Sequence, residues 1–209
     1  KRATLHNADF IEQLDLHYDD IVSVEKGGEI IPKITSVDLN QRNDGSQKVT
    51  FITHCPECGT QLVNIEGETA WYCPNTLGCP PQIKGRIEHF ISRKAMNIES
   101  LGEGKVEVLF DNNLIKDYSD LYNLKYNDIF GLEKIIVVDD GKENIVRKVS
   151  FKEKTANNII DAIEKSKNIP FARVLFALGI KYVGETTAKL IAKAMGSIDN
   201  IINASVEEL

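Results

Sequence analysis

The spacing of hydrophobic residues along the chain changes twice, near residue 55 and again near residue 80. Before residue 55, apolar residues come in short runs such as Ile21-Val22-Ser23-Val24, separated by glycine and asparagine turns, which is typical of β-strands. After residue 80 they recur at helical spacing, and one stripe consists of Ile83, Ile87, Phe90 and Ile91. The pattern predicts a multidomain α+β protein with a small β domain, a polar loop and an all-α region.

Residues 1–54 are expected to form the β domain. The expected elements are a helical turn within residues 5–14, strands at 21–24, 29–39 and 48–53, and turns at Gly27-Gly28 and Asn43-Asp44-Gly45. Pro32 interrupts the second strand, which indicates a sheet edge or a bulge. A partly open five-stranded barrel fits this order, with its first strand upstream of Lys1.

The all-α region is expected to consist of repeated helix-hairpin-helix units. Leu101-Gly102-Glu103-Gly104-Lys105 is a tight G-x-G turn between helices. Val183-Gly184-Glu185-Thr186-Thr187-Ala188 is a second such turn, after a helix over 170–178 that stops at Gly179. A further copy would start near Ala204 and is cut short.

The copy between these two turns is interrupted by an insertion. It opens at Phe130-Gly131-Leu132, and Ser150-Phe-Lys-Glu153 is a capping box that starts the next helix. The insertion, residues 133–149, is expected to form a β-hairpin around Asp139-Asp140-Gly141. Prolines at 80 and 81 suit the first turn of the helix that carries the stripe. On that helix we expect Arg86 and Arg93 to share another face, which could meet phosphates or simply be solvated.

The charge balance limits how the chain could bind nucleic acid. Its net charge is -6, and residues 1–54 carry 6 basic and 9 acidic groups, residues 55–95 carry 4 and 4, and residues 96–209 carry 15 and 18. Because no segment is basic overall, DNA binding cannot rest on a positive field and must use local geometry. No run approaches the ~20 apolar residues that span a bilayer, so we expect a soluble protein.

All four cysteines fall within one short segment, Cys55, Cys58, Cys73 and Cys79. The spacing C-x2-C-x14-C-x5-C lets two tight turns aim four thiolates at one point, and zinc is the usual ion for such ligands. With no ligand position open to water, the zinc would be structural. The alternatives are two disulfides or four unrelated thiols, but no apolar signal segment indicates an oxidising compartment. Zinc-bound thiolates imply a reducing, cytoplasmic setting.

The glycine turns offer a way to hold DNA without many lysines. A helix start presents unpaired amides and a partial positive charge, and glycine lets a phosphate approach them closely. Two such units could hold both strands through phosphates without reading bases. The alternative is that Gly102, Gly104 and Gly184 are ordinary turn and cap residues of a helical bundle.

This order of parts resembles the bacterial NAD-dependent DNA ligases. The stretches that carry the resemblance are Arg2-Ala-Thr-Leu-His-Asn7, Gly28-Glu-Ile-Ile-Pro32, Thr53-His-Cys-Pro-Glu-Cys-Gly59, His89-Phe-Ile-Ser-Arg93, Ile163-Glu-Lys-Ser-Lys167 and Phe171-Ala-Arg-Val-Leu-Phe-Ala-Leu-Gly-Ile180. The resemblance covers essentially the whole chain. It implies a partial OB-fold over residues 1–54, a small four-cysteine zinc finger over 55–80 and a tandem helix-hairpin-helix domain over 81–209.

The family seals nicks in duplex DNA after NAD adenylates a lysine in a K-x-D-G motif. No such motif is present, and the nearest match, Arg42-Asn-Asp-Gly45, has arginine in the nucleophile's place. The resemblance therefore implies the DNA-gripping part of a ligase, without catalytic residues and inactive alone, while NAD and Mg²⁺ would serve an absent catalytic domain. The start at Lys1 without methionine, and a helix-start pattern at 205–208, indicate a piece of a longer protein.

The resemblance also implies the binding residues. Arg2 corresponds to a barrel residue that faces the DNA backbone, and the four cysteines correspond to the zinc ligands. The DNA-contacting hairpins correspond to Gly102, Gly104, Lys105, Val183, Gly184, Thr186 and Thr187. The insertion at 133–149 departs from the family's short turn.

The implied partner is nicked double-stranded DNA, bound without sequence preference by a monomer in the cytoplasm at the nucleoid. One alternative is a non-catalytic DNA-junction or repair-scaffold module that shares hairpins and a structural zinc. Another is a protein-docking platform.

Overall fold

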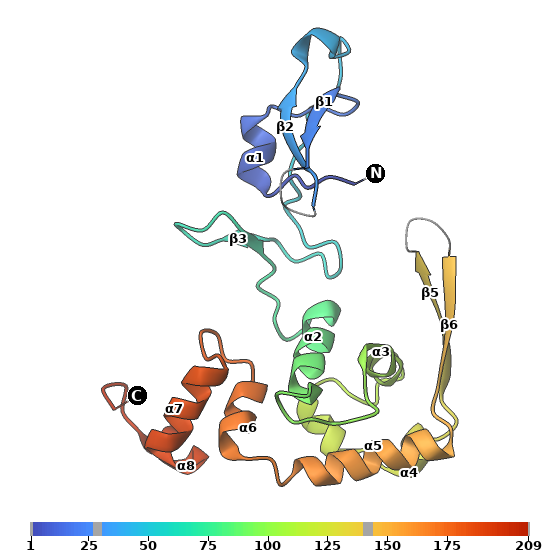
Figure 1. The fold of residues 1–209 in the computed structure, drawn as a ribbon, viewed down its shortest axis with the longest axis vertical. Coiled ribbons are helices and arrows are strands. Elements are labelled where there is room, and N and C mark those ends of the chain that lie inside the picture. Colours follow the sequence, from blue (N-terminus) through green and yellow to red (C-terminus); the bar gives the residue numbers. More distant parts are fainter. Residues whose placement is uncertain (1, 27–30, 140–143, 209) are drawn as a thin grey trace. The chain divides into compact units, whose positions relative to one another are not determined.

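The computed structural model describes residues 2–26, 31–139 and 144–208 (Figure 1). The chain divides into a first unit, Lys1–Cys79, and a second unit, Pro80–Leu209. The predicted turn at Gly27-Gly28 and the Asp140-Gly141 tip of the predicted hairpin lie outside the described residues. Among the described residues, no helix combines the length and the apolar composition needed to cross a membrane.

The first unit begins with a short helix and a two-stranded antiparallel sheet. The elements are α1 (Ala8–Gln13), β1 (Val22–Glu25), β2 (Lys33–Val37) and the 3-10 turn η1 (Leu39–Gln41). The Asn7 side chain caps α1 by accepting a hydrogen bond from the amide of Phe10 at 2.9 Å. The register of β1 against β2 shifts between Ser23 and Val24. The predicted helical turn and the first strand are confirmed, and the second strand, expected over 29–39, is confirmed over Lys33–Val37.

The strand expected over residues 48–53 is wrong. Within the described residues, this segment makes one isolated bridge, from Lys48 to His17, and the sheet of β1 and β2 has only two strands. Phe51 and Ile52 remain 39% and 52% exposed. An apolar run forms a stable strand only when neighbouring strands cover it, and the described residues supply none here. They therefore do not form the expected five-stranded barrel.

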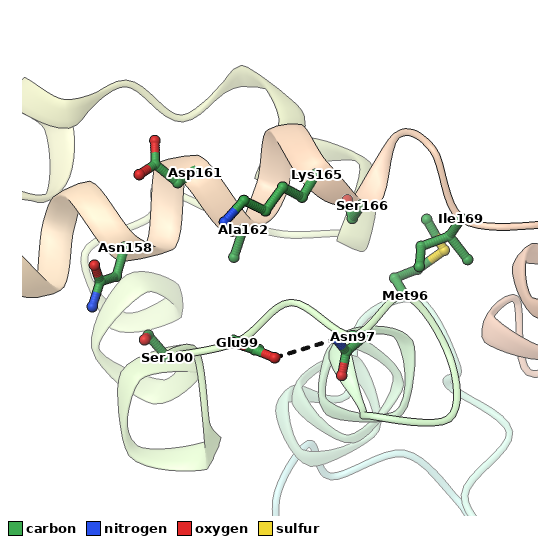
Figure 2. A pocket seen from close by; sticks show the side chains of 10 residues that line it. All are labelled: Met96, Asn97, Glu99, Ser100, Asn158, Asp161, Ala162, Lys165, Ser166 and Ile169. Atoms are coloured by element: carbon green, nitrogen blue, oxygen red, sulfur yellow. Dashed lines mark hydrogen bonds between the residues drawn. The ribbon is translucent and has the colours of Figure 1, made fainter.

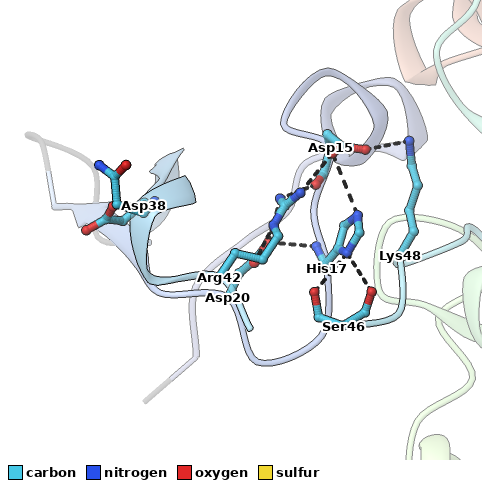
Figure 3. A network of polar contacts seen from close by, with 8 residues as sticks. Asp15, His17, Asp20, Asp38, Arg42, Ser46 and Lys48 are labelled. Carbon is cyan, nitrogen blue, oxygen red and sulfur yellow. Dashed lines mark hydrogen bonds and ion pairs between the residues drawn. The ribbon is translucent and has the colours of Figure 1, made fainter. Parts of the chain in front are cut away.

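A polar network holds the first unit together where a barrel core would otherwise do so (Figure 3). Arg42 Nε donates to Asp20 Oδ1 at 2.9 Å, and its Nη1 donates to Asp15 Oδ2 at 2.9 Å. The Asp20 side chain is 1% exposed, so its charge is desolvated and depends on this partner. Up to residue 54, only two hydrophobic side chains are buried in the described part of this unit, Ile11 and Leu16.

The same network lowers the pKa of both carboxyl groups. Hydrogen bonds from Lys48 and then Arg42 lower the pKa of Asp15 from 3.8 to about 2, and Arg42 lowers that of Asp20. A carboxyl with a depressed folded-state pKa stabilises the fold above its ordinary pKa, and that stability is lost as the pH falls toward 2. The R-x-D-G segment is thus a turn, as expected, and its arginine is held by ion pairs that the sequence did not reveal.

The second unit is mainly helical. Its helices are α2 (Pro80–Ile91), α3 (Glu103–Asp111), η2 (Tyr118–Asn123), α4 (Tyr126–Ile129), α5 (Glu153–Ser166), α6 (Phe171–Ala177), α7 (Glu185–Met195) and α8 (Ile198–Asn203) (Figure 1). The predicted apolar stripe of α2 is buried, and it packs with Leu109 of α3 and Ile159 of α5 in one core. Helix α6 ends before Gly179, whose φ of +64° only glycine adopts freely.

Arg93 does not share a helix face with Arg86, which corrects the sequence-based expectation. Helix α2 ends at Ile91, and the chain then folds back over the helix end. The amide of Met96 donates to the Phe90 carbonyl and that of Ile98 to the Ile91 carbonyl, both at 3.0 Å. Arg93 lies in this turn, so the helical spacing of residues cannot be used to predict its position beyond Ile91.

The insertion forms the predicted β-hairpin, with β5 (Glu133–Asp139) paired in register to β6 (Asn144–Ser150). At its base, the amide of Gly131 donates to the Phe151 carbonyl and the amide of Phe151 to the Leu132 carbonyl, both at 2.9 Å. Lys134 pairs with Glu107 and Asp111 of α3, and the hydrogen bond to Asp111 is the main cause of its raised pKa.

The predicted capping box at 150–153 is wrong. Ser150 is the last residue of β6 and pairs with Glu133, so its backbone belongs to the ladder. Lys152 is the N-cap residue of α5 and makes no side-chain cap. Ser150 therefore belongs to the strand and does not cap α5, although the local sequence pattern predicts that it does.

Phe151 anchors the hairpin base and is 0% exposed, whereas the nearby Phe130 is 52% exposed. We expect Phe151→Ala to destabilise the second unit by about 3–5 kcal/mol, since it leaves a cavity in a closed core. Phe130→Ala, the matched control, should cost about 1 kcal/mol or less, chiefly through the lost stacking on Tyr126. Urea unfolding followed by circular dichroism measures both, and equal losses would contradict the prediction.

Candidate zinc centre and nucleic-acid interface

The four cysteines of the first unit converge on one point. Their Sγ atoms all lie within 4.8 Å of one another. Cys55 Sγ is 3.9 Å from Cys79 Sγ, and Cys58 Sγ is 3.5 Å from Cys73 Sγ. A tetrahedral ion bound at about 2.3 Å would set such sulfur pairs roughly 3.8 Å apart. These distances fit a shared zinc ion and exceed the ~2.05 Å of a disulfide bond.

Two tight turns place the sulfur atoms. In the first, the amide of Gly59 donates to the Cys55 carbonyl at 2.9 Å, and Gly59 has a φ of +69°. In the second, the Asn75 side chain accepts from the amide of Gly78 at 2.9 Å, and the amide of Cys79 donates to the Asn75 carbonyl at 3.0 Å. A Cβ on Gly78 would lie 2.7 Å from Asn75 Oδ1, so a larger residue here would displace the side chain that accepts from the Gly78 amide.

The segment around the sulfurs lacks the apolar core that would fold it unaided. Its strands β3 (Val63–Asn64) and β4 (Trp71–Tyr72) have two residues each. Apart from the cysteines, the cluster buries Leu62 alone among the described residues. A cross-link through the four sulfurs therefore supplies the stability that burial does not.

The environment of the sulfurs favours a bound cation. Hydrogen bonds with Thr60, whose Oγ1 is 3.2 Å from Cys58 Sγ, lower the pKa of the Cys58 thiol to about 6. Burial raises the pKa of the Cys73 thiol to about 12, because its thiolate is poorly solvated. Zinc, when bound, would supply the positive charge that lets all four sulfurs exist as thiolates.

The first glycine corner, residues 101–105, lies at the start of α3. Gly102 is the N-cap residue and offers no side-chain cap. Its carbonyl accepts from the amides of Lys105 at 2.8 Å and Val106 at 3.0 Å. The amides of Glu103 and Gly104 have no backbone acceptor within the described residues. Gly104 lies inside the first turn of α3 rather than in the connecting turn, which corrects the G-x-G interpretation.

The second glycine corner, residues 183–187, lies at the start of α7. Gly184 is the N-cap residue, again without a side-chain cap, and its carbonyl accepts from the amide of Ala188 at 2.9 Å. A Cβ at Gly184 or Gly102 would meet nothing within 4 Å, so both corners open to solvent. Thr186 and Thr187 are exposed in the first turn of α7, and Val183 is half-buried. The arrangement leaves helix-start amides accessible at two places.

Lysines gather at the second corner although the chain is acidic overall. Glu185 Oε2 is 3.5 Å from Lys94 Nζ, and Glu185 Oε1 is 2.8 Å from Lys189 Nζ. The hydrogen bond from Lys189 is the main cause of the lowered pKa of Glu185. Sequence reasoning missed both lysines. The i,i+4 spacing from Glu185 to Lys189 was available, but the approach of Lys94 depends on tertiary structure.

The predicted basic residues occupy different settings. Lys105 Nζ donates to the Ser100 carbonyl at 2.5 Å, and burial lowers the pKa of Lys105, so it braces its own hairpin. Arg86 Nε on α2 is buried without a hydrogen-bond partner among the described residues. Arg93 is exposed after α2, and Arg2 is exposed in the first unit. The zinc segment, residues 55–79, contains no lysine or arginine and therefore offers no cation to a phosphate.

A cavity of about 340 Å³ is lined by the loop of residues 96–100 and by residues 158–169 (Figure 2). It separates the loop of residues 96–100 from α5. Its lining includes Glu99 and Asp161 as well as Lys165, and Asn97 Nδ2 donates to Glu99 Oε1 at 3.5 Å. Because the lining mixes both charges, it does not specify a ligand.

Family models match three parts of the chain. Residues 1–46 match the NAD-dependent DNA ligase OB-fold domain. Residues 54–80 match the NAD-dependent DNA ligase C4 zinc finger domain, which includes all four cysteines. Residues 173–209 match a helix-hairpin-helix motif, which contains the second corner. The cysteine geometry and the zinc-finger match together support a structural zinc.

Curated relatives match the whole chain. It is 56% identical to a DNA ligase of Phocaeicola vulgatus, 55% identical to one of Bacteroides fragilis and 54% identical to one of Flavobacterium psychrophilum, over 209 residues in each case. The chain spans 29% of the length of each of these relatives.

We expect the purified chain to carry about one zinc ion per molecule. Cys73→Ser should lose it, because three sulfurs no longer close the tetrahedron, whereas Glu57→Gln in the same segment should retain it. Elemental analysis measures the stoichiometry. Chelation should expose the amides of residues 55–79 to hydrogen exchange before those of the second unit. Intact disulfides in the wild-type chain would contradict the zinc site.

Proposed function

We propose that this chain, which belongs to the NAD-dependent DNA ligase family, forms the DNA-gripping part of a ligase that seals nicks in duplex DNA. The proposal assigns an OB-fold to residues 1–54, a zinc finger to 55–80 and tandem helix-hairpin-helix units to 81–209. The observation that carries it is the pair of exposed helix starts at Gly102 and Gly184, which have no side-chain cap.

In this proposal the two corners hold DNA through its phosphates. Each helix start offers backbone N–H groups and the positive end of the helix dipole, and the missing Cβ lets a phosphate oxygen come close. The hydroxyls of Thr186 and Thr187 can donate to the same phosphate, and Lys94 and Lys189 add positive charge. The phosphate contacts of Arg2, Arg86, Arg93 and Lys105 remain predictions. Such contacts carry no base information, so binding is independent of sequence.

In this proposal, a separate domain of the intact enzyme carries out the chemical reaction. NAD and Mg²⁺ would act at a lysine in a separate catalytic domain, since Arg42 in the R-x-D-G turn is paired with Asp15 and Asp20. The intact ligase is proposed to act as a monomer in the cytoplasm, at the nucleoid. The matches of the first two domains to ligase models favour this function over a non-catalytic junction module.

The chain should bind nicked duplex DNA with an affinity that falls as salt rises. A plot of log K against log salt should be linear with a slope of about −0.9 per phosphate neutralised. Duplexes of unrelated sequence should bind with affinities within a factor of about three, because no bases are read. Fluorescence anisotropy titrations between about 50 and 200 mM salt, a range over which phosphate binding weakens strongly, test both points. Strong preference for one sequence, or a flat salt plot, would count against the proposal.

A carboxylate at the second corner should weaken this binding without harming the fold. Gly184→Asp places an acceptor at the N-cap of α7, where aspartate stabilises a helix but repels phosphate. We expect affinity for nicked duplex to fall about tenfold, or ~1.4 kcal/mol, with no loss in melting temperature. Ser197→Asp, at the N-cap of α8, makes the same charge change and should leave affinity within about twofold. Equal effects of the two variants would exclude the second corner as a phosphate site.

A further inference from the structure

Helices α2 and α6 donate hydrogen bonds to each other's ends. Arg173 of α6 donates from Nε to the Lys94 carbonyl at 3.1 Å and from Nη2 to the Arg93 carbonyl at 2.5 Å, in the turn that follows α2. In return, His89 Nε2 of α2 lies 2.8 Å from the Phe176 carbonyl near the end of α6. The His89 ring also packs edge-on against the Phe176 ring, with centroids 4.8 Å apart.

Arg173 provides donors for two carbonyl groups near the end of α2 that have no backbone donor among the described residues. The carbonyls of His89, Phe90, Ile91 and Ser92 accept from amides of the turn itself. The next two carbonyls, of Arg93 and Lys94, accept from the one guanidinium of Arg173. A planar guanidinium can reach two neighbouring carbonyls at once, which the single ammonium of lysine does not do with fixed geometry.

The same turn connects the two glycine corners. It leads from α2 through the loop of residues 96–100 to Gly102. Lys94, whose carbonyl Arg173 holds, reaches Glu185 in the first turn of α7 with its side chain, at 3.5 Å. Arg173 itself lies on α6, which leads into the second corner. A single side chain therefore ties the approach to the first corner to the helix that precedes the second.

We propose that Arg173 is a positioning residue, which fixes the two glycine corners in the relative position that lets both engage one duplex. This inference rests on the proposed function. Arg173 acts through the Arg93 and Lys94 carbonyls and not by touching phosphate. Its charge alone is therefore insufficient, and lysine at this position does not replace it.

The test compares Arg173→Lys and Arg173→Gln with the wild-type chain in salt titrations on nicked duplex. Both variants should bind about tenfold more weakly, and the salt slope should become shallower by about one, since the phosphate contact at one corner is lost. His89→Leu, which removes the reciprocal bond, should change the slope in the same way. Lys167→Gln, at the exposed C-cap of α5, is the control for lost charge and should keep the wild-type slope.

Each outcome is decisive. A variant that is only less folded binds fewer molecules at every salt concentration, so weaker binding with an unchanged slope would overturn the positioning role. Wild-type slope and affinity in Arg173→Lys would also overturn it, because charge alone would then suffice. Failure of the wild-type chain to bind duplex DNA would instead overturn the proposed function itself.

Discussion

Helix-start amides can bind a ligand only if no internal acceptor takes them first, and this constraint shapes the second unit. Among the other helices, α1 and α8 are capped by side chains, whereas α5 and α6 are not. Asn7 accepts from the amide of Phe10 at the start of α1, and Ser197 accepts from that of Asn200 at the start of α8. At α3 and α7 the N-cap is glycine and no side chain caps the helix. A glycine N-cap costs each helix only roughly a few tenths of a kcal/mol relative to serine or asparagine, and the open amides remain available.

Leaving amides open is tolerable because stability comes from elsewhere, and the two units obtain it differently. The second unit buries a continuous apolar core from α2 to α5, centred on side chains such as Ile87 and Leu109. The first unit buries little apolar surface and relies on the Arg42 network and on four sulfurs at one point. Ion pairs and metal ligands fix a few atoms precisely, while apolar burial supports a whole helix array.

Features set by nearby residues could be predicted from the sequence. The spacing of Cys55 to Cys79 fixes two turns, and the α2 stripe needs only helical periodicity. Features set by distant partners could not. Residues 48–53 have strand composition, but whether they pair depends on neighbours that no local pattern specifies. Helix α2 ends at Ile91 because the amides of Met96 and Ile98 fold back and donate to carbonyls at its end. Helical periodicity in the sequence does not reveal this, and it wrongly predicts that Arg93 lies on the helix. Ser150 belongs to β6 because it pairs with Glu133 of β5, and a local capping pattern cannot reveal that pairing.

Net charge is likewise a poor guide to a local site, and the second corner shows why. Glu185 in the first turn of α7 suits the helix dipole, yet alone it would repel a phosphate at the same amides. Lys189 lies one turn further along α7, and Lys94 belongs to the turn that follows α2. The ammonium groups of these two lysines offset the one carboxylate of Glu185. The corner is therefore locally positive in a chain whose net charge is -6. Because Lys94 reaches Glu185 only while its turn is held against α6, the charge at the corner and the packing of the helices cannot be separated.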